Sequence, residues 1–368
     1  MNTLLFALRG APAAQTSGPE FYVAFWMVVA LTAYAFLGTA DFGGGLWDLF
    51  ATGPRADEWR RLIARAMGPV WEPNHVWLLF AVVLLFSGFP TVFSTLSVAL
   101  FLPLHLVLLG IVLRGAAFVF RSYGPFDSTV GRVWASVFGA ASIMTPFLLG
   151  VSLGAVSSGA IRVVGGAVQA DLVRAMLSPF SLLVGLLTLM LGAYVAAVYL
   201  TLEGEGRVRE DFRRRALWAG LTVAVLAAVL LPLMQRAVPW LAANLLHPRS
   251  LPLLLAGALS AALSAWALWT RRFHLARFTA VAEVITLFWG WSLAQFPYLV
   301  YPDLTLFNAA APPRTLNFML RIIPWGLAIL LPSLFLLFRV FKGENPAVPE
   351  GRPPDGGNQE GRRSGPTV

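Results

Sequence analysis

Three side chains that can exchange protons lie where two long apolar segments approach a short loop. Asp41 lies in Gly-Thr-Ala-Asp-Phe-Gly-Gly-Gly at residues 38–45, near the end of the first segment. Glu72 and His75 are three residues apart in Pro-Val-Trp-Glu-Pro-Asn-His-Val-Trp at residues 69–77, where the second segment begins. An acid at mid-bilayer costs about 2.5–3.5 kcal/mol on insertion scales, so such groups are retained mainly where they have a function, such as a proton relay. The pattern therefore favours proton movement across a membrane.

The composition places these residues in an integral membrane protein. The chain has 368 residues, of which 58% are hydrophobic and 12% are charged, and its mean hydropathy is +0.72. Soluble domains are about 45–50% apolar and about 25% charged. Since a span needs about 20 largely apolar residues, we expect an all-α polytopic fold with about nine transmembrane helices. The expected spans lie near residues 20–42, 74–94, 97–120, 133–156, 176–202, 214–236, 251–270, 278–301 and 315–340.

The chain divides into three expected parts. Residues 1–19 form an N-terminal extracytoplasmic segment, residues 20–342 form the transmembrane domain, and residues 343–368 form a disordered cytoplasmic tail rich in proline, glycine and charge. Between the first two spans, an apolar stripe at helical spacing predicts a short amphipathic helix near 55–67 on the cytoplasmic surface. The residues of this stripe are Trp59, Leu62, Ile63, Ala66 and Met67.

Basic residues alternate from loop to loop and indicate the orientation. Four arginines lie between residues 51 and 70, five lie between 203 and 215, and three lie between 271 and 277. Arg339 and Lys342 follow the last span. Because cytoplasmic loops are enriched in lysine and arginine, the N-terminus is expected outside and the C-terminus in the cytoplasm.

The remaining composition excludes several classes of function. The net charge is +9, but the arginines border the spans, where they set topology and meet anionic lipid headgroups, so we expect no nucleic-acid partner. The chain has no cysteine, which excludes disulfides and thiolate metal sites. No cluster of histidine and glutamate suggests a metal site either.

Two further ionisable residues are expected in the cytoplasmic half of the bilayer, together with Asp41, Glu72 and His75. Arg114 lies in the third span and Glu283 in the eighth, each about two helical turns from basic residues. Arg114 either tunes the charge of proton-carrying acids or neutralises Asp41 or Glu72 in a buried pair that fixes helix packing. Glu283 has no motif around it, and a structural role is at least as well supported there. The three glycines at 43–45 also suit a close helix contact.

The histidines offer little for haem ligation. His105 lies in the middle of its span, in Pro-Leu-His-Leu, whereas His75 lies near the opposite end of its own span. A bis-histidine haem needs two rings that face each other at one level. We therefore interpret His105 as a packed histidine and expect no haem or metal bound by this chain.

An ordered set of motifs resembles subunit II of cytochrome bd-type quinol oxidases. Beside residues 38–45 and 69–77, the set includes Phe-Ser-Gly-Phe-Pro at 86–90 and Leu-Arg-Gly at 113–115. It ends with Tyr-Leu-Thr-Leu-Glu-Gly-Glu-Gly from residue 199 and Gln-Phe-Pro-Tyr-Leu-Val-Tyr-Pro at 295–302. Each block is weak alone, but the blocks keep the family's order from about residue 20 to residue 340.

The resemblance implies two four-helix bundles plus a peripheral helix, paired with a haem-bearing subunit I. Subunit I would hold the b- and d-type haems and the quinol site, and subunit II would carry no haem ligand. The family's carboxylates in the first two motifs are associated with proton uptake from the cytoplasm. The matching residues here are Asp41 and Glu72, with His75 and Arg114 beside them. The expected location is the bacterial inner membrane, with lipid and quinone as further partners.

The sequence departs from the family pattern at two points. Gly38 stands near the place of a first acid, and Glu72-Pro73 replaces an Asp-Gly pair. A glutamate keeps the charge but is one methylene longer. The proton route is therefore expected to be altered, or to rely partly on His75.

Two other functions suit the same acids. One is a proton-coupled secondary transporter, although transporters show broken helices at matching places in two halves, and Pro73, Pro90 and Pro103 all fall in one half. The other is a purely structural partner whose ion pairs are inert. Co-purification with a haem-bearing protein would separate these functions from the oxidase.

Overall fold

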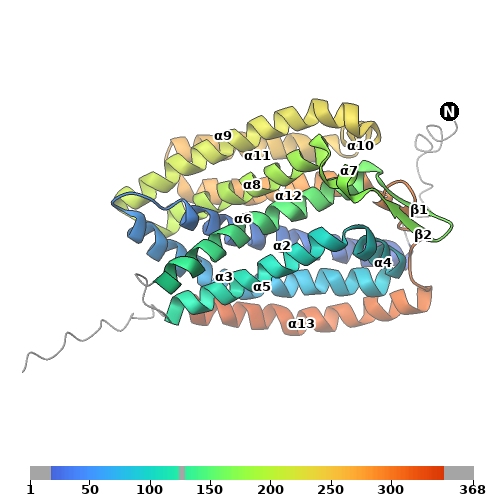
Figure 1. Ribbon diagram of the computed structural model, residues 1–368, viewed down its shortest axis with the longest axis horizontal. Coiled ribbons are helices and arrows are strands. Elements are labelled where there is room, and N and C mark those ends of the chain that lie inside the picture. Colours follow the sequence, from blue (N-terminus) through green and yellow to red (C-terminus); the bar gives the residue numbers. More distant parts are fainter. Residues whose placement is uncertain (1–17, 124–128, 344–368) are drawn as a thin grey trace, which may run out of the picture.

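A computed structural model describes residues 18–123 and 129–343 (Figure 1). A few side chains inside these ranges, that of Glu72 among them, lie outside the described part. Most of the predicted segments 1–19 and 343–368 also lie outside it. The described elements are α2 (Pro19–Leu49), α3 (Ala56–Gly88), α4 (Pro90–Ala99), α5 (Phe101–Tyr123), α6 (Thr129–Ser158), β1 (Ile161–Val164), β2 (Ala167–Ala170), α7 (Leu172–Met176), α8 (Pro179–Glu203), α9 (Gly206–Ala237), α10 (Pro239–Leu245), α11 (Leu251–Trp269), α12 (Phe273–Gln295), β3 (Tyr298–Val300), β4 (Leu304–Thr305) and α13 (Pro313–Gly343).

The described part of the chain is a polytopic helical membrane protein, as the sequence predicts. Seven of its helices are long and apolar enough to cross a membrane, and an eighth span results if α3 and α4 count as one broken span. The axes of α3 and α4 differ by 114° at the break before Pro90. By length and composition the described helices give seven or eight spans, and α12, which overlaps the predicted span 278–301, is not among them.

The apolar stripe predicted near 55–67 lies in the first turns of α3, which continues to Gly88 as one helix. All five residues of the stripe are buried. They pack in a core cluster with Val195 on α8, Phe212 on α9 and Leu268 on α11. The helical spacing therefore identified a buried face, and that face contacts other helices of the protein.

The long helices pack as two neighbouring groups. In the first, α2 contacts α3 and α6, and α6 contacts α5. In the second, α8, α9, α11 and α12 form a ring in which each contacts the next. Helices α2 and α6 also contact α8 and so join the groups, while α13 lies along α2 and α3 at the outer edge (Figure 1).

The three consecutive glycines of α2 face three different helices. A Cβ on Gly43 would overlap the carbonyl oxygen of Gly192 on α8, and one on Gly44 would lie 2.7 Å from Met67 Cγ on α3. A Cβ on Gly45 would overlap Ser142 Oγ on α6. The predicted close helix contact is thus present three times, and it brings α2 against α3, α6 and α8 at one level.

Two short hairpins lie at the end of the molecule remote from the arginine-rich loops (Figure 1). In the first, Ile161 pairs with Ala170 and Val164 pairs with Ala167. Gly165 and Gly166 form its turn with φ of 58° and 82°, a conformation that favours glycine. Arg162 on β1 forms a salt bridge with Asp303, in the turn between β3 and β4, at 2.8 Å.

Candidate functional site

Asp41 and Arg114 form a buried ion pair between α2 and α5. Arg114 Nη1 donates to Asp41 Oδ2 at 2.8 Å and Nη2 donates to Oδ1 at 2.7 Å, so both carboxylate oxygens are engaged. Nη2 also donates to the backbone oxygen of Asp41 at 2.9 Å. Asp41 is 1% exposed and Arg114 is 2% exposed. A bidentate pair of this kind is the strong, directional form of a charge-assisted hydrogen bond.

Helix α6 completes the surroundings of the guanidinium. Arg114 Nε donates to Ser142 Oγ at 3.0 Å, and Ser142 in turn donates to the Phe138 carbonyl at 2.7 Å. The guanidinium carbon lies 4.7 Å from the ring centre of Phe138 and 5.2 Å from that of Phe42. Four of the five guanidinium N–H groups can be assigned to these four hydrogen bonds, which holds the side chain in one position.

Two polar side chains near the pair are buried without a hydrogen-bond partner in the described part of the chain. Neither the Oδ1 nor the Nδ2 atom of Asn74 makes a hydrogen bond of ordinary geometry, although Asn74 is 0% exposed and its amide interacts with the Asp41 carboxylate. The hydroxyl of Tyr34 is in the same situation, and it lies within electrostatic range of Asp41 and Arg114. Buried polar groups of this kind are the usual binding places of ordered water.

Three of the four candidate residues from the sequence come together. His75 on α3 is half-buried and within electrostatic range of Asp41, beside the pair with Arg114. The backbone of Glu72 lies in α3, three residues before His75, but its side chain is outside the described part. Of the two roles considered for Arg114, its contacts with Asp41 match the one in which it neutralises this acid in a buried pair.

Glu283 belongs to a different group of helices. It lies on α12, is 4% exposed and interacts with Tyr194 on α8, whose hydroxyl donates to Ser264 on α11. Among the described residues, the ion pairs of Asp41 and Arg114 do not include it. Among the described residues, three acids are buried: Asp41 and Asp48 on α2 in the first group of helices, and Glu283 on α12 in the second.

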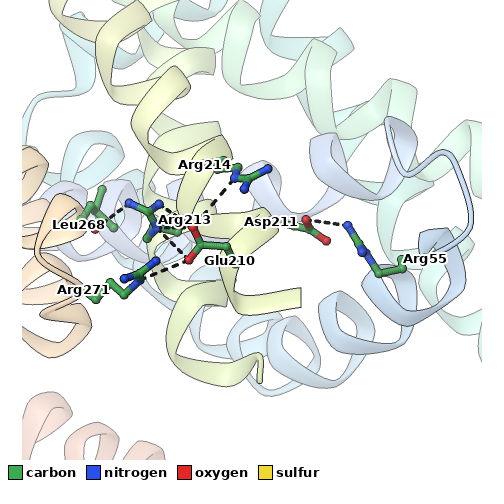
Figure 2. A network of polar contacts seen from close by, with 7 residues as sticks. All are labelled: Arg55, Glu210, Asp211, Arg213, Arg214, Leu268 and Arg271. Atoms are coloured by element: carbon green, nitrogen blue, oxygen red, sulfur yellow. Dashed lines mark hydrogen bonds and ion pairs between the residues drawn. The ribbon is translucent and has the colours of Figure 1, made fainter. Parts of the chain in front are cut away.

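Ion pairs connect the arginine-rich segments with one another (Figure 2). Arg55, before α3, lies 2.8 Å from Asp211 on α9, and the Trp59 indole donates to the same carboxylate at 3.2 Å. Glu210 lies between arginines of two elements, as Figure 2 shows, with Arg213 and Arg214 from α9 and Arg271 from the turn before α12. The ion pairs thus join loops that the sequence assigned to the same side of the membrane.

The histidines lie on separate elements. His75 is on α3, His105 on α5 and His274 on α12, and His247 follows α10. His105 is exposed on its helix, so the interpretation of it as a packed histidine was wrong, and its Nδ1 lies 2.7 Å from the Phe101 carbonyl. Among the residues that the structure describes, no group of three or more histidines and acids could hold a metal ion.

Sequence reasoning missed Asn74, Tyr34, Ser142 and Tyr194. Asn74 stood inside the second motif, and its position between Glu72 and His75 was a usable signal. Tyr34 lies seven residues before Asp41, which places it on the same face of a helix after two turns. Ser142 and Tyr194 carry no sequence signal. Only the packing of α6 against α5 and α2 brings Ser142 to Arg114, and only the packing of α8 against α12 brings Tyr194 to Glu283.

The chain matches the family model of cytochrome bd terminal oxidase subunit II over residues 19–341. It is 29% identical to the cytochrome bd ubiquinol oxidase subunit 2 of Bacillus subtilis over 208 residues, covering 55% of this chain and 59% of that protein. It is 25% identical to the cytochrome bd-I ubiquinol oxidase subunit 2 of Escherichia coli K12 over 355 residues, covering 85% of this chain and 90% of that protein.

A solved structure shows the same fold. A chain of the bd oxidase from Geobacillus thermodenitrificans superposes with a TM-score of 0.74 at 24% identity, covering 88% of this chain and 98% of that chain.

Proposed function

Because the chain belongs to the cytochrome bd terminal oxidase subunit II family, we propose that it is the haem-free second subunit of a membrane quinol:oxygen oxidoreductase. It would support a haem-bearing subunit I in the bacterial inner membrane and supply a route by which cytoplasmic protons enter the complex. The family match over residues 19–341 is the observation that carries this proposal. The b- and d-type haems and the quinol site belong to subunit I in this proposal, and the isolated chain is not catalytic.

The exposed apolar helix faces suit a partner subunit and lipid. On α5, Leu108, Leu109 and Val112 are 58%, 48% and 58% exposed, and on α13 Trp325 and Ile329 are 73% and 72% exposed. Such surfaces are stable within a bilayer or against another membrane helix.

The proton route would pass Glu72 and His75 at the start of the apolar part of α3. Asp41 would act in it as a fixed negative charge, because Arg114 engages both of its oxygens. The buried amide of Asn74 and the hydroxyl of Tyr34 would bind the water that carries protons onward. Arg114 would hold the net charge of the site near zero and keep Asp41 ionised.

The membrane assembly tests the subunit role. Affinity purification of the tagged chain from its native membrane is expected to bring a haem-bearing partner, seen in the visible spectrum, together with quinol-dependent oxygen uptake. A colourless chain that purifies alone and shows substrate flux in vesicles would contradict the subunit role and favour a proton-coupled transporter. The family match gives that transporter no support.

Variants test the proton route within the assembled complex. Glu72→Gln and His75→Asn are expected to slow quinol-dependent oxygen uptake and to change its pH dependence, with the haem spectrum unchanged. Glu58→Gln is the matched control, because Glu58 is an exposed acid on the same helix. If both variants keep the wild-type rate and pH profile, the proton route is wrong while the subunit role stands.

A further inference from the structure

Glu283 lies among hydroxyl groups in the ring formed by α8, α9, α11 and α12. The residues are almost fully buried: Glu283 is 4% exposed, Tyr194 is 3% exposed and Ser264 is 0% exposed. Glu283 is ten residues from the start of α12 at Phe273, which is about 15 Å along the helix. An acid at this depth has no access to bulk water and must be accommodated by its neighbours.

The hydrogen bonds around Glu283 have a direction. Tyr194 donates its hydroxyl hydrogen to Ser264 Oγ, and Ser264 donates to the backbone carbonyl of Ala276 at 3.2 Å. A carbonyl can only accept, so both hydroxyl hydrogens point away from Glu283. The carboxyl of Glu283 also interacts with the Tyr194 hydroxyl. With the tyrosine hydrogen engaged by Ser264, a hydrogen bond between the Tyr194 oxygen and Glu283 requires a protonated carboxyl as its donor.

The charges around the carboxyl lead to the same conclusion. No arginine, lysine or histidine is paired with Glu283 in the ranges 18–123 and 129–343, and its Oε2 atom has no hydrogen-bond partner there. A buried carboxylate without a cation is strongly unfavourable, whereas a neutral acid is tolerated. Tyr194 is the titratable side chain that interacts with it from α8, and Ser264 is the polar one on α11.

The charged groups on the other packed helices are engaged elsewhere. On α2, Asp41 is paired with Arg114. On α9, Glu210 and Asp211 form their ion pairs at the arginine-rich end, and the Arg215 guanidinium lies 3.9 Å from the ring centre of Trp59. On α12 itself, the Arg277 guanidinium lies 5.2 Å from the ring centre of Tyr199. The ion pairs among the described residues therefore include no cation bound to Glu283.

We propose that Glu283 is a neutral carboxylic acid that releases and rebinds a proton through the hydroxyls of Tyr194 and Ser264. On release, the carboxyl proton passes to the Tyr194 oxygen, the tyrosine hydrogen passes to Ser264 Oγ, and the serine hydrogen passes to a water molecule beyond it. The carboxyl is then a carboxylate toward which both hydroxyls point. One proton has left, each hydroxyl keeps one hydrogen, and no electron moves.

The geometry of α12 supports this direction of transfer. The Ala276 carbonyl lies inside α12, so it accepts an intrahelical hydrogen bond in addition to the one from Ser264. When Ser264 turns toward Tyr194, Ala276 therefore keeps its helical donor and is not left unpaired. The relay can reverse without leaving a buried backbone carbonyl unsatisfied, which is a cost that normally fixes such hydrogen bonds in one orientation.

Infrared difference spectroscopy of the purified complex tests the proposal. The wild-type spectrum minus that of Glu283→Gln is expected to show the C=O band of a protonated carboxyl at neutral pH, with a shift in heavy water. Carboxylate bands in its place would overturn the proposal. Glu210→Gln is the matched control and is expected to give carboxylate bands, because Glu210 lies between arginines.

A second variant keeps the test decisive if Glu283→Gln does not assemble. Tyr194→Phe removes the hydroxyl that accepts from Glu283, so the protonated band is expected to remain and to move to higher frequency. A band that does not move would show that Tyr194 does not take this proton and would overturn the relay. Since the bands are read from this chain at rest, the result does not depend on oxygen uptake or on the route through Glu72.

Discussion

The carboxyl of Asp41 lies against a guanidinium, whereas the carboxyl of Glu283 lies among hydroxyl groups, although both are almost fully buried. Asp41 receives two hydrogen bonds from Arg114 and is thereby held as an anion. Glu283 has no such cation in the described ranges, and the hydroxyl of Tyr194 donates away from it. The difference teaches that the charge of a buried acid is set by its nearest donors and not by its burial alone.

The largest expected effect comes from breaking the pair at Asp41. Arg114→Met keeps much of the side-chain volume but leaves a buried carboxylate without a cation. We expect a loss of about 3–5 kcal/mol in the free energy of unfolding of the complex in detergent. The double variant Asp41→Leu with Arg114→Met is expected to recover most of that loss. Equal free energies of unfolding for wild type and Arg114→Met would show that this pair does not stabilise the complex.

The next effect concerns the contact that joins the two groups of helices. Gly43→Ala places a Cβ against the carbonyl oxygen of Gly192, so α2 and α8 must separate. Overpacking of this kind costs about 1–3 kcal/mol. Gly326→Ala on α13 is the matched control, because a Cβ there meets no atom within 4 Å. Thermal unfolding should separate the two variants, and equal midpoints would mean that this contact tolerates a wider spacing.

A smaller effect is expected from the hydroxyl chain. Tyr194→Phe removes one buried hydrogen bond to Ser264 but leaves no buried charge unpaired. We expect a loss of about 0.5–1.5 kcal/mol in the free energy of unfolding. A loss as large as that of Arg114→Met would indicate that Glu283 is an anion held by Tyr194, and the contrast between the two acids would disappear.

The smallest effect concerns an acid outside the spans. The hydrogen bonds from Arg162 hold the pKa of Asp303 below its usual range, with a further contribution from the Val163 amide. The folded pKa is lower than the unfolded value of about 3.9, so this stabilisation is complete above that pH and is lost as the pH falls through the folded pKa.

Arg162→Gln tests this pH dependence. The variant is expected to unfold with a slightly flatter dependence on pH in the acid range than wild type does. The difference is small because the Arg162 side chain is 50% exposed. An unchanged acid profile would show that solvent screens the pair completely. The Arg162–Asp303 pair titrates in this acid range. The infrared C=O band assigned to Glu283, by contrast, should not change there.

The sequence motifs allowed more of the Asp41–Arg114 site to be predicted than of the surroundings of Glu283. Asp41 and Arg114 stood out because charges are rare in apolar segments, and their similar depth led to the pair as one of two alternatives. The fold class followed from the apolar segments. The length of α3 did not, because its first turns carry arginines and resemble a surface helix until Phe212 and Leu268 are seen to cover them.

The surroundings of Glu283 could not be predicted in the same way. Tyr194 and Ser264 are ordinary residues of apolar helices, and only the ring of α8, α11 and α12 brings them beside the acid. The direction of their hydrogen bonds depends on one backbone carbonyl, that of Ala276. Spacing within one helix carries no information about such a contact.

A comparison of two amide variants tests the central contrast most directly. Asp41→Asn and Glu283→Gln each replace an acid by its neutral amide of nearly the same shape, so unfolding of the two purified complexes can be compared at one neutral pH. We predict that Asp41→Asn loses about 3–5 kcal/mol, because Arg114 stays buried without its anion. Glu283→Gln should lose less than about 1 kcal/mol, because a neutral group replaces a neutral group. Equal and large losses in both variants would contradict the assignment of Glu283 as a neutral acid.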